Sequence, residues 1–264
     1  MSALQLIRLP ISLLELSRWA ARRNYGFTLR RDPKGQQRDA GFDEGRALHH
    51  LLAESFGPGV LQPFRYIVAP GAKQSHIYAY SRLDKAALQV AAQTYALPEV
   101  SRIFDPAQLD AKAMPERWRA GRRLGFEIRV RPVSRLLKPL SAEGSAFAKG
   151  AEVDAFLIEA LRNFPNGLEA DMQKAGRSRE AVYTDWLAQR VKGATTLESG
   201  VRLTHFQRLR AARKSYSPEG PDAVLQGDLT VDDPARFLEL LSQGIGRHKA
   251  YGYGMLLLRP PRRP

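Results

Sequence analysis

The chain of 264 residues contains no cysteine, which excludes disulfide bonds, a thiolate nucleophile and cysteine-ligated zinc. Long apolar runs are missing as well, since no stretch approaches the roughly 20 apolar residues that a membrane-spanning helix needs. The first residues alternate in polarity and show no signal-peptide pattern. We therefore expect a protein of the reducing cytoplasm with no membrane partner. Its 44% of hydrophobic residues can build a sizeable core.

Acidic residues are scarce relative to basic ones: 27 aspartates and glutamates stand against 41 lysines and arginines, a net charge of +14. Such an excess favours a polyanionic partner, because each phosphate that a cation neutralises releases a counterion. Nucleic acid fits better than an anionic membrane, since no basic amphipathic helix with a Trp, Phe or Leu face is present. A solvated surface rich in arginine is the alternative.

Potential metal ligands are also few. The five histidines lack metal-site spacing and have no acidic cluster beside them, and they are His49, His50, His76, His205 and His248. We expect no metal and no cofactor. Any phosphodiester chemistry would then be metal-independent, because metal-dependent nucleases usually need carboxylate ligands.

The hydrophobic pattern predicts the same order of elements twice, strand–helix–strand–strand–helix–strand. This order is that of the split βαβ, ferredoxin-like unit. We predict an α+β protein with two tandem ferredoxin-like domains, residues 1–115 and 116–264, joined by a polar linker at 105–121. The predicted strands are 3–9, 64–70, 75–81, 99–104, 124–133, 200–210, 223–231 and 253–259, and the predicted helices are 11–20, 43–56, 84–93, 153–163, 179–191 and 232–244. Segments 22–41 and 164–178 are predicted to be loops. Strands 64–70 and 75–81 are predicted to form a hairpin around Pro70-Gly71, and the last helix is predicted to have Asp233 near its N-cap and Pro234 as its first residue.

The predicted helix 43–56 carries two adjacent histidines on different faces. Its N-cap is Asp43, and Gly57-Pro58 ends it. At about 100° per residue, His49 lies at the rim of an apolar stripe, with Arg46 one turn earlier on the same flank. His50 lies nearly opposite, in solvent, where Glu54 can pair with it. The stripe consists of Leu48, Leu51, Leu52 and Phe56.

An imidazole at the rim of a helix suits RNA cleavage by transesterification. A 2′-hydroxyl attacks the neighbouring phosphorus and the 5′-oxygen leaves, which requires a proton acceptor and donor with a pKa near 7. A nearby cation stabilises the charged phosphorane. His49 and Arg46 are therefore the candidate catalytic residues, and a solvated surface histidine is the alternative.

Two basic segments of the second half are candidate RNA-binding surfaces. In the strand 200–210, alternation places Arg202, Arg208 and Arg210 on one face with Thr204 and Phe206, and His205 on the other face as a core or interface residue. An arginine-rich strand face suits a phosphate backbone. A solvated sheet face is the alternative.

The second segment is "QGIGRHKAYGYGMLLLRPP" (243–261), in which four glycines surround a basic triplet. Glycines allow close backbone approach, and successive N–H groups can form an anion-binding nest. The candidate RNA-binding residues here are Gly244, Gly246, Arg247, Lys249, Gly252 and Gly254, with His248 a weaker one. We expect residues 243–254 to cross the second domain near its junction with the first, close to the RNA and to the helix that carries His49. A tight packing turn is the alternative. The pattern precedes a strand and does not open a helix, which excludes P-loop and Rossmann sites.

Four stretches of the chain resemble the CasE family, the CRISPR RNA-processing endoribonucleases of the type I-E Cascade complex. The terminal "GIGRHKAYGYGMLLLRP" is similar to that family's glycine-rich segment, and "DPARFLELLSQ" to the helix before it. "LGFEIRVRPVSR" resembles the strand that opens the family's second domain, and "LHHLLAESF" the helix that carries its histidine.

The resemblance implies two ferredoxin-like domains, binding of the CRISPR repeat stem-loop, and other Cascade subunits as partners. It implies metal-independent cleavage at the 3′ base of the stem, leaving a 2′,3′-cyclic phosphate, and a catalytic histidine at His49. The chain departs from the family at Arg46, where many members have tyrosine, and at Glu54, where some have lysine. Arg46 or a cation of the basic loop (Arg22, Arg23 or Lys34) would replace the missing lysine.

Two other functions compete with a nuclease that stays bound to its product hairpin. One is a non-cleaving, RNA-hairpin-binding subunit of a ribonucleoprotein complex, in which His49 is incidental. The other is an RNA-binding accessory protein unrelated to CRISPR.

Overall fold

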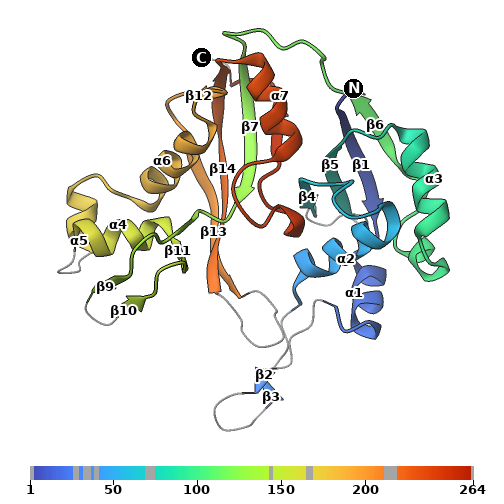
Figure 1. Cartoon of the computed structure of the whole chain (residues 1–264), viewed down its shortest axis with the longest axis horizontal. Helices are drawn as coiled ribbons and strands as arrows, with labels where there is room; N and C mark the ends of the chain where they lie inside the picture. Colours follow the sequence, from blue (N-terminus) through green and yellow to red (C-terminus); the bar gives the residue numbers. More distant parts are fainter. Residues whose placement is uncertain are drawn as a thin grey trace.

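The computed structural model describes residues 3–25, 30–31, 37–38, 42–68, 75–142, 145–164, 169–210 and 219–262. Within these ranges, each half of the chain forms an antiparallel sheet with packed helices, and the two halves lie side by side (Figure 1). None of the described helices is both long and apolar enough to cross a membrane.

The first half builds a four-stranded sheet in the order β4-β5-β1-β6, whose face turned away from the second half is covered by α1, α2 and α3 (Figure 1). Alternation in β1 buries Ile7, Leu9 and Ile11 against these helices, as the predicted period of two requires. The elements are β1 (Gln5–Ile11), α1 (Leu13–Arg22), α2 (Glu44–Phe56), β4 (Phe64–Ile67), β5 (Ser75–Ser81), α3 (Lys85–Tyr95) and β6 (Asp110–Ala113). Between α1 and α2 lie the two-residue strands β2 (Arg30–Arg31) and β3 (Gln37–Arg38). The predicted β4–β5 hairpin is confirmed, and its expected turn at Pro70-Gly71 lies outside the described residues.

The strand predicted at 99–104 is wrong. Residues Pro98–Arg102 form the 3-10 helix η1, and Val100 within it and Ile103 directly after it are buried, three residues apart. The fourth strand of the sheet is β6, inside the predicted linker, after a second short 3-10 helix, η2 (Pro106–Gln108). Because β6 is a largely exposed edge strand, it lacks the apolar alternation that marks a strand in a sequence.

The second half builds a sheet in the order β12-β14-β7-β15, and β13 pairs with β14 along the same edge as β12, opposite β7. Helices α6 and α7 share a buried core with the apolar face of β7 and β14. The elements of this sheet and its helices are β7 (Arg123–Val130), α6 (Arg179–Val191), β12 (Thr195–Leu197), β13 (Arg202–Arg210), β14 (Glu219–Val231), α7 (Pro234–Gln243) and β15 (Leu256–Arg259). The N-cap Asp233 and the first-turn Pro234 of α7 are confirmed.

A smaller unit between β7 and α6 consists of short strands and two helices. Its elements are β8 (Val133–Arg135), β9 (Leu140–Ala142), β10 (Ser145–Phe147), β11 (Glu152–Asp154), α4 (Ala155–Asn163) and α5 (Glu169–Lys174). Helix α5 lies in the segment predicted to be a loop.

The two halves share a buried interface. Figure 1 shows α7 and the segment after it between the two sheets, and α7 contacts β5. Leu4, Tyr80 and Met114 of the first half belong to the core of the second, and the buried Tyr80 hydroxyl donates to the Leu256 carbonyl at 2.9 Å. The position of one half therefore depends on the packing of the other.

Replacing Tyr80 by Phe tests this interface. The change leaves the Leu256 carbonyl without its hydroxyl donor, and we expect a loss of about 1 kcal/mol in the free energy of unfolding, measured with urea. Tyr95→Phe is the control, because the Tyr95 side chain is 62% exposed. Equal stability of the two variants would contradict the interface.

Candidate active site and nucleic-acid-binding surface

Helix α2 positions the candidate catalytic histidine. Its N-cap forms as expected, with the Arg46 N–H donating to Asp43 Oδ1 at 2.9 Å, and Gly57 ends the helix with a φ of 95°. The predicted apolar stripe is buried and consists of Leu48, Leu51, Leu52 and Phe56. His49 is half-buried at the rim of this stripe, and Arg46 lies one turn earlier.

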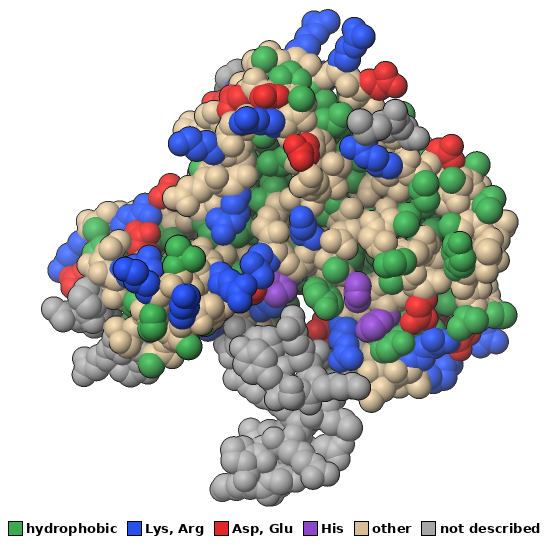
Figure 2. Space-filling model, in the orientation of Figure 1, with side chains coloured by type: hydrophobic (Ala, Val, Ile, Leu, Met, Phe, Trp, Pro, Cys, Tyr) green, Lys and Arg blue, Asp and Glu red, His purple; other side chains and the backbone are tan. Residues whose placement is uncertain are grey.

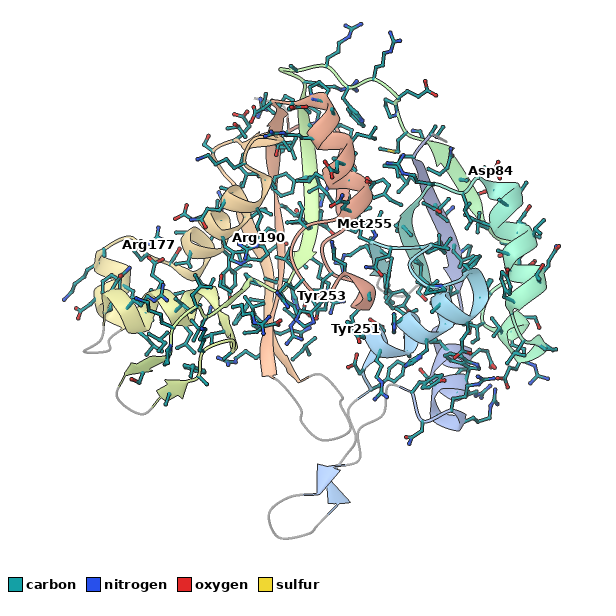
Figure 3. The ribbon with its side chains drawn as sticks, in the orientation of Figure 1. Asp84, Arg177, Arg190, Tyr251, Tyr253 and Met255 are labelled. Atoms are coloured by element: carbon teal, nitrogen blue, oxygen red, sulfur yellow. The ribbon has the colours of Figure 1, made fainter. Side chains whose placement is uncertain are left out.

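The glycine-rich segment meets α2 at His49. The ring centroids of His49 and Tyr251 are 5.2 Å apart, and Tyr251 ends the 3-10 helix η3 (Lys249–Tyr251). One turn before His49, a Cβ on Gly45 would lie 2.7 Å from the Tyr251 carbonyl oxygen. Gly45 therefore permits an approach that any side chain would block, and the expected closeness of the segment to the His49 helix is observed. Figure 3 labels Tyr251 and Tyr253 between the two halves.

The interpretation of His50 as a solvent-exposed partner of Glu54 is wrong. The His50 ring stacks on Tyr25 with centroids 3.9 Å apart and planes inclined by 8°. Glu54 instead accepts from Arg23 Nη1 at 3.1 Å, and Arg23 also pairs with Glu99. Tyr25 follows α1, so helical periodicity within α2 alone could not reveal this packing. Lys34, another candidate cation, lies outside the described residues.

Burial sets the protonation of both histidines. Desolvation lowers the pKa of His49 below its ordinary value. Desolvation also lowers the pKa of His50, with additional lowering from His49 and Arg46 that outweighs the opposing effect of Glu54. A half-buried imidazole of lowered pKa is neutral at pH 7, which is the form that accepts a proton.

The glycines of the segment are used mainly for packing. Gly244, Gly252 and Gly254 have φ of 71°, 85° and 81°, values that favour glycine. A Cβ on Gly244 would lie 2.8 Å from Pro63, and one on Gly252 would lie 3.1 Å from Phe64, so both approach the first half closely. Together with the contact between Gly45 and Tyr251, these contacts pack the glycine-rich segment against the first half.

The anion nest expected from successive N–H groups is contradicted at Gly244, whose N–H donates to the Leu240 carbonyl at 2.9 Å. The N–H groups of Gly252 and Gly254 also have acceptors within the protein, the carbonyls of Lys249 at 3.4 Å and Arg129 at 2.7 Å. None of these three N–H groups is left for a phosphate. Gly246, with φ of 80°, lies against the Trp186 ring, where a Cβ would be 3.0 Å away.

The basic triplet is partly neutralised by an acidic side chain. Arg247 Nε pairs with Glu152 Oε1 at 2.6 Å, and His248 Nε2 lies 2.8 Å from Glu152 Oε2. Burial alone would raise the pKa of Glu152, but His248 and Arg247 hold it below its ordinary value. His248 has a φ of 62°, a conformation uncommon outside glycine. Lys249 begins η3 and is half-buried.

The predicted common face for the β13 arginines is wrong, because the pairing with β14 shifts between Leu203 and His205. This β-bulge at Thr204 reverses the alternation beyond it. Arg202 pairs with Gln226, whereas Arg208 pairs with Pro221, which places the two arginines on opposite faces. Arg210, opposite Glu219, is in register with Arg208. His205 is exposed and not a core residue.

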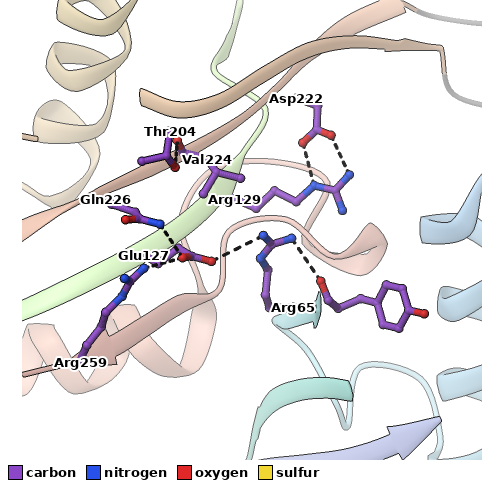
Figure 4. A network of polar contacts seen from close by, with 9 residues as sticks. Arg65, Glu127, Arg129, Thr204, Asp222, Val224, Gln226 and Arg259 are labelled. Carbon is purple, nitrogen blue, oxygen red and sulfur yellow. Dashed lines mark hydrogen bonds and ion pairs between the residues drawn. The ribbon is translucent and has the colours of Figure 1, made fainter. Parts of the chain in front are cut away.

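A buried polar network, which the sequence did not reveal, ties β7, β13 and β14 together (Figure 4). Arg129 donates to both carboxylate oxygens of Asp222 at 2.7 and 2.8 Å, and Gln207 donates to the same carboxylate. Beside it, Arg65 of the first half lies 3.6 Å from Glu127. Burial alone would raise the pKa of Asp222, but the hydrogen bond from Arg129 lowers it. The only signal in the sequence was the alternation of basic residues in "RVRP".

Charge on the surface gathers near the junction. Figure 2 shows histidine side chains between the two halves, with lysine and arginine side chains around them. Among the described residues, no three His, Asp or Glu side chains are grouped so that they could hold a metal ion. The junction therefore offers imidazole and cationic groups to a ligand.

The fold is that of solved CRISPR endoribonucleases. Cse3 bound to a 19-nucleotide RNA matches 98% of this chain and 100% of its own with a TM-score of 0.62 and 19% identity. Thermus thermophilus Cse3, bound to an RNA representing a pre-cleavage complex, matches the same shares with a TM-score of 0.56 and 19% identity. Cas6e from Escherichia coli K-12 matches with a TM-score of 0.53 and 17% identity, covering 97% of this chain and 99% of its own.

The chain belongs to the family of CRISPR-associated proteins, whose model matches residues 20–260. A comparison with curated proteins gives no match. The resemblance inferred from the four sequence stretches is thus confirmed as to family and fold.

The lowered histidine pKa values are testable by NMR titration of the free protein. We expect His49 and His50 to titrate below 6.5, because burial disfavours the imidazolium form. Between the lowered pKa of each folded histidine and its unfolded value of 6.5, the unfolded chain binds more protons than the folded one. The free energy of unfolding that the two histidines contribute is therefore fully present above pH 6.5 and is lost as the pH falls through their folded-state pKa values. The His49→Ala and His50→Ala spectra assign the resonances. A His49 midpoint at or above 6.5 would contradict the half-buried site.

Proposed function

We propose that this protein is a metal-independent endoribonuclease that cleaves CRISPR repeat RNA at the base of its stem-loop and stays bound to the product hairpin. One observation carries the proposal: the half-buried His49 imidazole lies where α2 meets the glycine-rich segment of the other half. The fold shared with Cse3, solved in complex with RNA, supports it.

The proposed reaction is attack of a 2′-hydroxyl on the adjacent phosphorus. Neutral His49 accepts the proton of that hydroxyl, the 5′-oxygen leaves and takes a proton from water, and the imidazolium returns its proton to solvent, giving a 2′,3′-cyclic phosphate and a 5′-hydroxyl. Arg46, on the same flank of α2, would stabilise the charge that develops on the phosphorane. Arg23 is a weaker choice for this role, because Glu54 and Glu99 already neutralise it.

The RNA would be held by two surfaces of the second half. Lys249 and Arg247, beside His49 along the glycine-rich segment, are proposed phosphate contacts, with Arg247 exchanging Glu152 for phosphate. Arg202 on one face of β13, and Arg208 and Arg210 in register with each other on the opposite face, are proposed contacts to different parts of the stem. The glycines of the segment would allow the close packing that holds this surface in place, and they are Gly244, Gly246, Gly252 and Gly254.

The proposal extends to architecture and assembly. The strand orders β4-β5-β1-β6 and β15-β7-β14-β13 support assigning both halves to the ferredoxin-like fold, with domains 1–115 and 116–264. Other Cascade subunits are proposed partners, and the cytoplasm the proposed location.

Cleavage of the repeat RNA from the protein's own CRISPR array tests the function. We expect cleavage in excess EDTA to a product ending in a 2′,3′-cyclic phosphate, identified by mass spectrometry. His49→Ala should slow single-turnover cleavage by about 10²- to 10⁴-fold, the range for a general acid–base group, while hairpin affinity stays near wild type.

His50→Ala is the matched control for this measurement. Loss of the stack on Tyr25 should lower the melting temperature and leave cleavage largely intact. Equal loss of cleavage in both variants would contradict the assignment of His49. Tight hairpin binding without any cleavage by the wild-type protein would instead indicate a non-cleaving RNA-binding subunit.

A further inference from the structure

Arg131 is a buried cation to which the described residues offer no acidic partner. It follows β7 directly, and only 7% of its surface is exposed. Its Nε is buried without a hydrogen-bond partner, and among the described residues no carboxylate pairs with it. A buried charge without a counter-charge destabilises the folded protein.

The neighbouring Arg129, two residues earlier and within β7, has a full counter-charge. Asp222 accepts two hydrogen bonds from its guanidinium. Both guanidinium groups contact the Tyr253 ring, with Cζ 4.7 Å from the ring centroid for Arg129 and 5.9 Å for Arg131. Asp222 is fully engaged by Arg129 and Gln207. The ring is therefore the sole described electrostatic partner of Arg131.

A glycine in β14, Gly220, leaves space for the Arg131 guanidinium. A Cβ on Gly220 would lie 3.0 Å from Arg131 Cζ and would collide with Nη2. Gly220 lies within β14 and does not have a positive φ, so the backbone conformation there does not call for glycine. The missing side chain at position 220 instead makes room for Arg131 next to Tyr253.

We propose that Arg131, held between Gly220 and Tyr253, binds a phosphodiester group of the RNA backbone. The inference rests on the proposed RNA-binding function and adds a contact to it. A guanidinium presents a planar set of N–H donors that matches phosphate oxygens, and a phosphate supplies the missing negative charge. Tyr253 belongs to the glycine-rich segment whose Tyr251 contacts His49, so the phosphate lies along the same segment as the candidate catalytic group.

Binding and stability of the full-length protein, in the non-cleaving His49→Ala background, test the proposal. The probe is the repeat RNA hairpin of the protein's own array, titrated over a range of salt concentrations. Arg131→Gln should weaken binding at least about tenfold, the effect of losing a charge-assisted hydrogen bond. It should also reduce the slope of log K against log salt by roughly 0.7 to 0.9, the value for one phosphate contact.

The melting temperature without RNA separates a binding role from a structural one. Arg131→Gln removes an uncompensated buried charge, so this temperature should stay equal to that of the parent or rise. Arg119→Gln, at an exposed position of the segment between the two sheets, is the charge-matched control and should leave the salt slope unchanged. An unchanged slope together with a lowered melting temperature for Arg131→Gln would overturn the proposal.

Gly220→Ala is a second, independent test, because it keeps the charge but displaces the guanidinium. It should weaken RNA binding at least about tenfold as well. Parent-like affinity of Gly220→Ala would overturn the proposal even if Arg131→Gln did not fold. If the parent binds the hairpin and Arg131→Gln binds it equally well, only this inference fails. If the parent does not bind the hairpin, the proposed function fails with it.

Discussion

The structure depends on one close approach of two backbones, that of the glycine-rich segment to the first turn of α2. Gly45 admits the Tyr251 carbonyl at a distance that leaves no room for a side chain, and Tyr251 then contacts His49. Gly244 and Gly252 extend the contact to Pro63 and Phe64. Packed interiors tolerate no added atoms without displacement. The position of the His49 imidazole relative to the second half therefore depends on these glycines, which have no side chain, as much as on the side chains that pack around it.

The charges of the second half divide into neutralised and available ones. Arg129 is neutralised by Asp222 and rigidifies the sheet, and Arg247 is neutralised by Glu152 at the surface. A buried pair such as the first is costly to break, whereas a half-exposed pair can exchange its partner at little cost. Arg131 has no such carboxylate partner in the part of the chain that the structure describes. A net charge of +14 thus predicts attraction to a polyanion. Which cations are available to a phosphate depends on the ion pairs of the individual side chains.

Local signals in the sequence were sufficient for much of the fold. Asp43 and Asp233 begin their helices as predicted, and alternation located β1, β5 and β7. The errors have physical causes. The edge strand β6 has little apolar surface to bury, and a single extra residue at Thr204 turns Arg202 away from Arg208. Helical periodicity placed His49 at the rim of the stripe, but His50 is covered by Tyr25 from the segment that follows α1. Contacts between distant segments, such as Arg131 with Gly220, leave no local pattern.

The most direct test of this account is the single-turnover rate constant for cleavage of the repeat RNA by Gly45→Ala. In an ordinary helix interior alanine is favoured over glycine by about 1 kcal/mol, so α2 itself should form at least as well. Here the added Cβ would lie 2.7 Å from the Tyr251 carbonyl oxygen and must push α2 away from the glycine-rich segment. The account predicts a rate at least about a hundredfold below wild type, the lower end for loss of a general acid–base group. A wild-type rate from this variant would contradict the claim that the contact between α2 and the glycine-rich segment positions His49.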